Sequence, residues 1–223
     1  MQVALRQLVV PTGQQLLIRD VSWQMYEDIL VELGERRGTR INYSQGMLEI
    51  IAPLPEHEDD KAIIGDLIKV ILEELDIEFR SLASTTFKNQ AMQQAIEADD
   101  CFYIKHEALI RGKKRIDLAI DPPPDLAIEI DLTSRTRFNN YQALGVSELW
   151  RFDGIRLQIN VLQNGEYIES TTSPNLGGLE LGQIVPEYLE RSKVLGRNAT
   201  IRRFRAWLKD RSERLIEKAT KLD

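Results

Sequence analysis

Two acidic residues interrupt an apolar segment in the middle of the chain, residues 126–131. Because side chains alternate between the two faces of a β-strand, Glu129 and Asp131 share one face, about 7 Å apart. The apolar side chains between them occupy the other face. A charge inside a buried strand costs several kcal/mol unless it is paired or bound to a metal ion. The pattern therefore indicates a metal site or a structural ion pair.

A further carboxylate, Asp99, stands near the start of another apolar segment. Pairing of that segment with residues 126–132 would bring Asp99 beside Glu129. Two carboxylates from adjacent strands offer the oxygen ligands that Mg²⁺ prefers and leave positions for water. The structural alternative is a buried carboxylate paired with an arginine such as Arg115, and the pattern leaves both interpretations open. Asp125, about 13 Å from Glu129 along an extended strand, is expected in a strand-entry turn.

Hydrophobic spacing and turn residues predict the elements that must hold these carboxylates. Helices are expected over residues 23–33, 56–75 and 139–145, and again from Pro186 onward with a break near Gly196. Strands are expected over residues 39–43, 47–51, 77–82, 96–104, 116–120, 126–132, 148–152, 156–162 and 167–170.

This succession predicts an α+β fold in which a mixed β-sheet is flanked by helices. A single domain over residues 1–223 is expected. It would carry an N-terminal helix and hairpin elaboration over about residues 1–52 and basic helices over about residues 186–223.

Composition is that of a soluble globular protein, with 43% apolar and 29% charged residues. No apolar run approaches the ~20 residues that span a bilayer, and residues 1–6 are too short in apolar character for a signal peptide. We therefore expect a cytoplasmic protein with no membrane partner. The net charge is −6, but residues 191–223 carry 11 Lys and Arg against 4 Asp and Glu. A basic tail on an acidic body fits a helix that contacts phosphate, or simply a solvated helix face.

Four segments in order and spacing resemble a known family: residues 53–57, 97–99, 123–130 and 141–150. They are similar to the restriction-endonuclease-like superfamily of PD-(D/E)XK type, and more closely to its Uma-type branch of endonucleases. The resemblance implies a restriction-endonuclease-like core and metal-dependent hydrolysis of phosphodiester bonds, with DNA as substrate. Asp99 and Glu129 would be the two metal carboxylates, and His57 the histidine at the start of the core helix. Mg²⁺, or Mn²⁺ in its place, and a homodimer are implied too.

The chain departs from the pattern at two positions. Ala98 stands where the superfamily usually has proline, and Asp131 stands where a lysine is expected. Asp131 is therefore expected as a third metal ligand, while Arg135, Arg137 or Lys61 would supply positive charge. Arginine stabilises a phosphate but cannot act as a base. The missing lysine keeps open a catalytically impaired module that binds nucleic acid or a partner, and a hydrolase of small phosphoesters.

Other candidate residues receive structural interpretations. Cys101 and His106 are not expected to form a nucleophile–base pair, because five residues apart on a strand they point to opposite faces. The side chains that we expect in the core are Trp23, Trp150 and Trp207. Three arginines beside Phe204 and Trp207 could contact a phosphate backbone, a second copy of the chain or the body of the protein: Arg202, Arg203 and Arg205.

Overall fold

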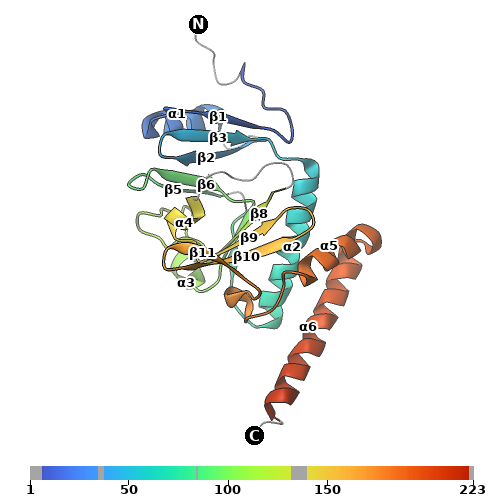
Figure 1. Ribbon diagram of the computed structural model, residues 1–223. Coiled ribbons are helices and arrows are strands. Elements are labelled where there is room, and N and C mark those ends of the chain that lie inside the picture. Colours follow the sequence, from blue (N-terminus) through green and yellow to red (C-terminus); the bar gives the residue numbers. More distant parts are fainter. Residues whose placement is uncertain (1–6, 35–37, 84, 132–139, 221–223) are drawn as a thin grey trace.

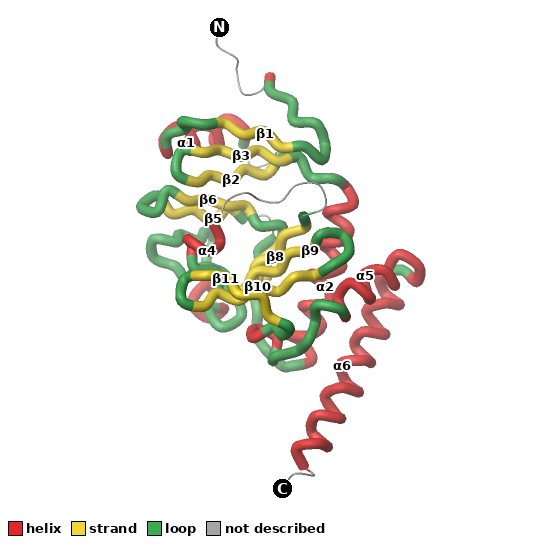
Figure 2. The backbone as a smooth tube through the Cα atoms, viewed as in Figure 1, coloured by secondary structure: helices red, strands yellow, loops and turns green. Residues whose placement is uncertain are grey.

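Two β-sheets lie one beyond the other along a long helix, α2 (Pro55–Glu74), in the computed structural model of the protein (Figure 1). The structure describes residues 7–34, 38–83, 85–131 and 140–220, with only the backbone path for 212–220. Figure 2 shows the same arrangement by secondary structure, with strands in the body and helices around it. The predicted α+β fold, with a mixed sheet flanked by helices, is confirmed.

The first sheet is antiparallel throughout and has the strand order β1-β3-β2-β6-β5. Helix α1 (Trp23–Leu33) packs on one of its faces. Its start is fixed by Ser22, whose Oγ accepts a hydrogen bond from the Met25 amide at 3.2 Å. The strands are β1 (Gln15–Ile18), β2 (Arg40–Ser44), β3 (Met47–Ile51), β5 (Thr86–Asn89) and β6 (Gln94–Glu97).

The second sheet is mixed, with the order β11-β10-β9-β8-β7-β4. β8 and β9 run parallel, and every other neighbouring pair in this sheet is antiparallel. Its strands are β4 (Arg80–Ser81), β7 (Asp100–Tyr103), β8 (Leu126–Ile130), β9 (Glu148–Phe152), β10 (Leu157–Gln163) and β11 (Glu166–Ser170). β8 lies between β7 and β9, and its residues are buried on both faces because a hydrophobic cluster covers each face.

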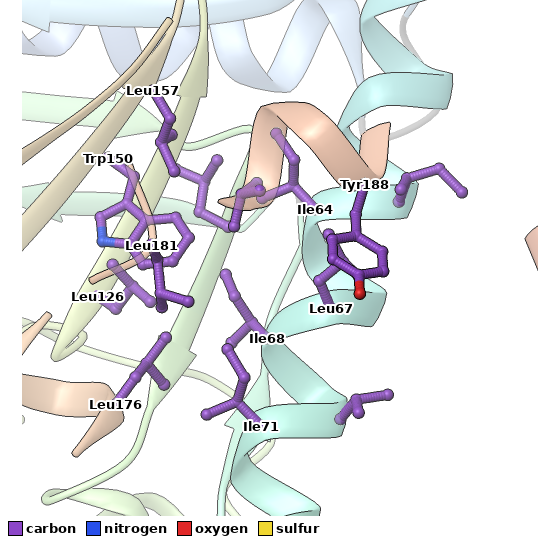
Figure 3. Packing of buried hydrophobic residues seen from close by; sticks show 14 of the residues in the cluster. Ile64, Leu67, Ile68, Ile71, Leu126, Trp150, Leu157, Leu176, Leu181 and Tyr188 are labelled. Atoms are coloured by element: carbon purple, nitrogen blue, oxygen red, sulfur yellow. The ribbon is translucent and has the colours of Figure 1, made fainter. Parts of the chain in front are cut away.

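The largest core lies between the second sheet and three helices: α2, α5 (Ile184–Leu195) and α6 (Arg197–Thr220). Figure 3 shows Ile64, Leu67, Ile68 and Ile71 of α2 pointing toward Leu126 and Trp150 of the sheet. Each fully buried aliphatic side chain of this kind contributes roughly 1.5–3 kcal/mol. The apolar face of β8 points into this core, and the opposite face belongs to a second cluster with α4 (Asn140–Leu144), as its alternation predicted.

Two predicted strands are wrong. The segment predicted as one strand over residues 96–104 is divided between the sheets, with Ala98 and Asp99 at the crossing. Residues 116–120 form turns, because aspartate side chains bind nearby amides: Asp121 accepts from Asp117 N at 3.0 Å, and Asp117 accepts from Ala119 N at 2.9 Å. The elements that sequence patterns missed are β1, β5, the short helix α3 (Glu107–Ile110) and the 3₁₀ turn η2 (Pro174–Leu176).

The basic C-terminal helices pack against the body, and the expected break falls at Gly196 between α5 and α6. Arg205 of α6 forms ion pairs with Glu73 at 2.9 Å and Glu74 at 2.5 Å, both on α2. Arg197 pairs in the same way with Asp66 at 2.5 Å. Part of the basic charge is thus matched within the chain, and the far end of α6 extends away from the body (Figure 1). Among the described residues, no helix has the length and apolarity to cross a membrane.

The buried carboxylate of Asp100 leaves no room for a side chain at position 65 of α2, so we predict that glycine is required there. A Cβ at position 65 would lie 2.8 Å from Asp100 Oδ2. The carboxylate cannot easily move, because its Oδ1 accepts from Cys101 N at 2.8 Å and Ser81 Oγ at 3.1 Å. Gly→Ala inside a helix ordinarily stabilises by about 0.5–1 kcal/mol. We expect Gly65→Ala instead to lower the free energy of unfolding by about 1 kcal/mol or more, measured by urea unfolding.

The matched control is the double variant Gly65→Ala, Asp100→Ala. The alanine at position 100 removes the atom that the new Cβ would meet. The double variant should therefore lose less free energy of unfolding than the sum of the two single variants. Strict additivity of the two single variants would contradict this explanation of Gly65.

Candidate functional site

Asp99 lies at the crossing between the two sheets, beside the strand that carries Glu129. β7 and β8 pair in a register that sets Asp100 opposite Ile128, so that Asp99, one residue earlier, comes next to Glu129. Asp99 Oδ2 accepts a hydrogen bond from the amide of Ile130 at 2.6 Å. Its carboxylate is only 1% exposed. The strand pairing expected from the sequence therefore occurs, although Asp99 itself stands outside both strands.

The partner of the second Asp99 oxygen is Arg40, the first residue of β2. Arg40 forms a close ion pair with Asp99 Oδ1, and its other terminal nitrogen lies 2.8 Å from Glu58 Oε1. The Arg40 side chain is 12% exposed, whereas that of Glu58 is 48% exposed. The arginine that neutralises the buried carboxylate is thus Arg40, not Arg115 as the sequence suggested. Sequence reasoning missed Arg40 because it comes from the other sheet.

Glu129 is buried and has a perturbed pKa. The phenol of Tyr141, on α4, donates a close hydrogen bond to Glu129 Oε1. Burial, and next the negative charge of Asp131, raise the pKa of Glu129 from 4.5 to about 7, against the opposing effects of the phenol, Arg40 and Arg151. Near neutral pH this carboxyl is therefore poised between its charged and neutral forms.

Asp131 follows the end of β8 and is paired with Arg151 of β9. Arg151 Nη1 lies 2.9 Å from Asp131 Oδ2, and the two side chains are 11% and 10% exposed. In the parallel ladder Arg151 is the residue opposite Glu129. An acid–base pair thus occupies the position where the superfamily carries its lysine. Of the other cations expected there, Arg135 and Arg137 lie outside the described residues, and Lys61 forms a close ion pair with Glu58.

His57 lies in the first turn of α2 and is 4% exposed. His57 is therefore a buried residue and not a surface histidine. Within the part of the chain that the structure describes, neither of its ring nitrogens has a hydrogen-bond partner. Burial, and next the charge of Arg40, lower the pKa of His57 below its ordinary value of 6.5. His57 is consequently a neutral imidazole at physiological pH, with a donor and an acceptor available.

Two further buried carboxylates, Asp125 and Glu148, are held by dense sets of donors. Asp125 accepts from the amides of Ile104 at 2.7 Å and His106 at 3.0 Å, and His106 Nδ1 lies 2.7 Å away. Asp125 is thus a structural residue at the entry to β8, as expected. Glu148 accepts from Trp150 Nε1 at 2.6 Å and from the side chain of Asn175 at 3.0 Å.

Cys101 and His106 do not form a dyad, in line with the sequence prediction. The buried Cys101 thiol donates to the carbonyl of Leu82 at 3.1 Å, and burial raises the thiol pKa. His106 is instead directed to Asp125. The three tryptophans pack in or against hydrophobic clusters, as expected, with Trp150 fully buried.

The donor set of the site suits a hard cation with few protein ligands. Asp99 Oδ1 is buried and has only the Arg40 cation beside it, with no hydrogen bond within the described residues. Glu129 adds a second carboxylate from the neighbouring strand. No group of three or more His, Cys, Asp or Glu that could hold a metal ion occurs in residues 7–34, 38–83, 85–131 and 140–220. The expected third ligand, Asp131, is therefore not gathered with the other two. Two carboxylates with water still fit Mg²⁺.

Comparison with known proteins identifies the family. Residues 23–193 match the model of the Uma2 family, described as "putative restriction endonuclease". The chain belongs to the Uma2 family. The match encloses Arg40, His57, Asp99 and Glu129, whereas α6 lies beyond it.

A solved structure has the same fold as this Uma2 chain. It is that of a "putative nuclease belonging to DUF820" from Anabaena variabilis ATCC 29413, with a TM-score of 0.51 and 17% sequence identity. The alignment covers 73% of this chain and 97% of that chain. Such a likeness concerns the fold alone. A search of curated proteins finds no match.

The raised pKa of Glu129 makes the stability of this Uma2 chain depend on pH. Because the folded pKa of about 7 exceeds the ordinary 4.5, the folded state binds more protons between these values. The stabilisation is fully present below pH 4.5 and is lost as pH rises through 7. We expect Glu129→Gln to remove this loss. The free energy of unfolding of the variant, relative to that of wild type, should therefore rise by about 3 kcal/mol between pH 4.5 and 8.

Urea unfolding at a series of pH values, without divalent metal, measures this difference. Glu166→Gln, which changes an exposed glutamate at the start of β11, is the matched control and should follow the wild-type profile. Parallel profiles for wild type and Glu129→Gln would show that Glu129 titrates normally.

Proposed function

We propose that the protein is a metal-dependent nuclease that hydrolyses phosphodiester bonds of DNA, with Asp99 and Glu129 as its metal ligands. The single observation that carries the proposal is the pair of adjacent buried carboxylates at the crossing between the sheets. Asp99 Oδ1 faces only the Arg40 guanidinium within the described residues, and Glu129 accepts a hydrogen bond from the Tyr141 phenol. Membership of the Uma2 family and the nuclease-like neighbour support the reaction class.

Mg²⁺, or Mn²⁺ in its place, would be held by one oxygen of Asp99 and one of Glu129. When bound, such an ion lowers the pKa of water and offsets negative charge that develops on phosphate oxygens. Binding needs the carboxylate form of Glu129, and a pKa of about 7 means that losing this proton costs little at neutral pH.

The remaining side chains position the metal ligands and transfer protons. The Tyr141 phenol fixes the Glu129 carboxyl through Oε1 and leaves Oε2 for other contacts. His57, neutral and with both ring nitrogens unpartnered among the described residues, can accept a proton at one nitrogen and donate at the other. Asp131, held by Arg151, assists by adding negative charge that would attract a cation, although the same charge also raises the pKa of Glu129.

A second function is a module that binds nucleic acid or a partner without cleaving. The specific observation in its favour is the pair Asp131–Arg151 at the position of the usual lysine, because a permanently protonated arginine cannot serve as a base. Binding without cleavage, weakened steeply by salt and unchanged by EDTA, would favour this module.

Turnover of small phosphoesters but not of DNA would favour the third alternative, a hydrolase of small phosphoesters. The homodimer implied by the resemblance also stays a proposal.

Cleavage of plasmid and single-stranded DNA with Mg²⁺ or Mn²⁺ tests the nuclease proposal. We expect Asp99→Asn and Glu129→Gln each to lower the rate by at least about 100-fold, because each removes a ligand charge in the transition state. Both substitutions preserve shape, and circular dichroism checks the fold. Glu166→Gln is the matched control and should cleave at the wild-type rate. Full activity in the double variant Asp99→Asn, Glu129→Gln would refute the assignment of the site.

A further inference from the structure

Arg40 is a cation that links the site to the first sheet, and the proposed mechanism gives it no task. Its guanidinium forms a close ion pair with Asp99, the ligand expected to hold the metal. The same charge lowers the pKa of His57 and opposes the rise in the pKa of Glu129. Arg40 therefore lies within electrostatic reach of all three side chains.

The contact atom decides what Arg40 can do. Asp99 Oδ2 is committed to the amide of Ile130 at 2.6 Å, so Oδ1 is the oxygen open to a cation, and Arg40 lies against it. A guanidinium remains protonated in proteins, so a change of pH does not remove this competitor. A divalent ion that uses Oδ1 must therefore displace Arg40.

Glu58 makes such a displacement feasible. The second terminal nitrogen of Arg40 is 2.8 Å from Glu58 Oε1, and the Glu58 side chain is about half exposed. A guanidinium released from Asp99 thus keeps one carboxylate partner at the edge of the site. An uncompensated buried charge, which would be strongly destabilising, does not arise, because the incoming ion neutralises Asp99.

We propose that Arg40 is the resident counter-ion of Asp99 and that it sets the metal affinity of the site by competing with the divalent ion for Asp99 Oδ1. This inference rests on the proposed function, because it takes Asp99 as a metal ligand. The alternative role for Arg40 is a structural link between β2 and the strand crossing. The two roles predict opposite signs for the change in metal affinity when the guanidinium is removed.

Calorimetric titration of the full chain with Mn²⁺, at constant pH and salt, measures the sign of this change in metal affinity. Arg40→Met keeps much of the aliphatic stem and removes the charge, and we expect it to bind Mn²⁺ at least about tenfold more tightly than wild type. Adding Asp99→Asn to this variant should abolish the gain. Arg205→Met, which breaks a surface arginine–carboxylate pair on α6, is the control and should bind Mn²⁺ as wild type does.

Glu58→Gln provides a second variant that does not disturb a buried charge. With Glu58 neutral, Asp99 is the ion-pair partner left to Arg40 among the described residues. Arg40 should then hold Asp99 more firmly, so Mn²⁺ binding should weaken by several-fold. Glu56→Gln removes an equal charge from an exposed position in the same helical turn and controls for general electrostatic attraction. If Mn²⁺ binding weakens equally in the two variants, the role of Glu58 is overturned, and with it the displacement of Arg40 by the divalent ion.

The outcomes separate this inference from the proposed function. If wild type binds Mn²⁺ and Arg40→Met binds it equally or less tightly, competition is overturned while the metal site stands. If only Arg40→Met binds Mn²⁺, and Asp99→Asn removes that binding, competition is supported and the wild-type metal site is refuted. If neither binds, both the competition and the metal dependence fail.

Discussion

The ion pair between Arg40 and Asp99 is the contact that brings the first sheet to the candidate site. It joins the start of β2 in the first sheet to the point where the chain enters the second. Asp99 is almost fully buried, and a buried carboxylate without its cation would be destabilising by roughly 3–5 kcal/mol. The charge balance beside Glu129 therefore includes a residue of the first sheet.

The crossing of the chain from one sheet to the other explains why the buried carboxylate of Asp99 contacts both a backbone amide and a cation. Where the chain leaves β6 and enters β7, the residues between them belong to neither ladder. The Asp99 side chain takes over a backbone role there, because its Oδ2 accepts from the amide of Ile130 at the end of β8. One oxygen thus holds two strands together and the other faces a cation. A side chain with a single acceptor could not serve both purposes.

Much of this could be predicted from the sequence, because local patterns determine local elements. The alternation in residues 126–131 correctly gave the two faces of β8, and the helix expected over residues 23–33 matches α1. The placement of Asp99 beside Glu129 followed from strand pairing alone. Arg40 and Tyr141 could not be assigned roles, because their contacts with Asp99 and Glu129 join distant segments. The division of residues 96–104 between two sheets depends on the whole first sheet, whose β1 and β5 carry weak signals.

The contrast among the buried carboxylates separates structural acids from the candidate ligands. Glu148 accepts hydrogen bonds from Trp150 and Asn175. Asp125 Oδ2 accepts from two backbone amides, and its Oδ1 faces His106. Glu129 has one phenolic donor and stands near a second negative charge at Asp131, and its pKa rises accordingly. Since a fold gains nothing from burying a poorly solvated carboxylate beside another acid, a divalent cation is the ligand that would turn this unfavourable arrangement into a favourable one.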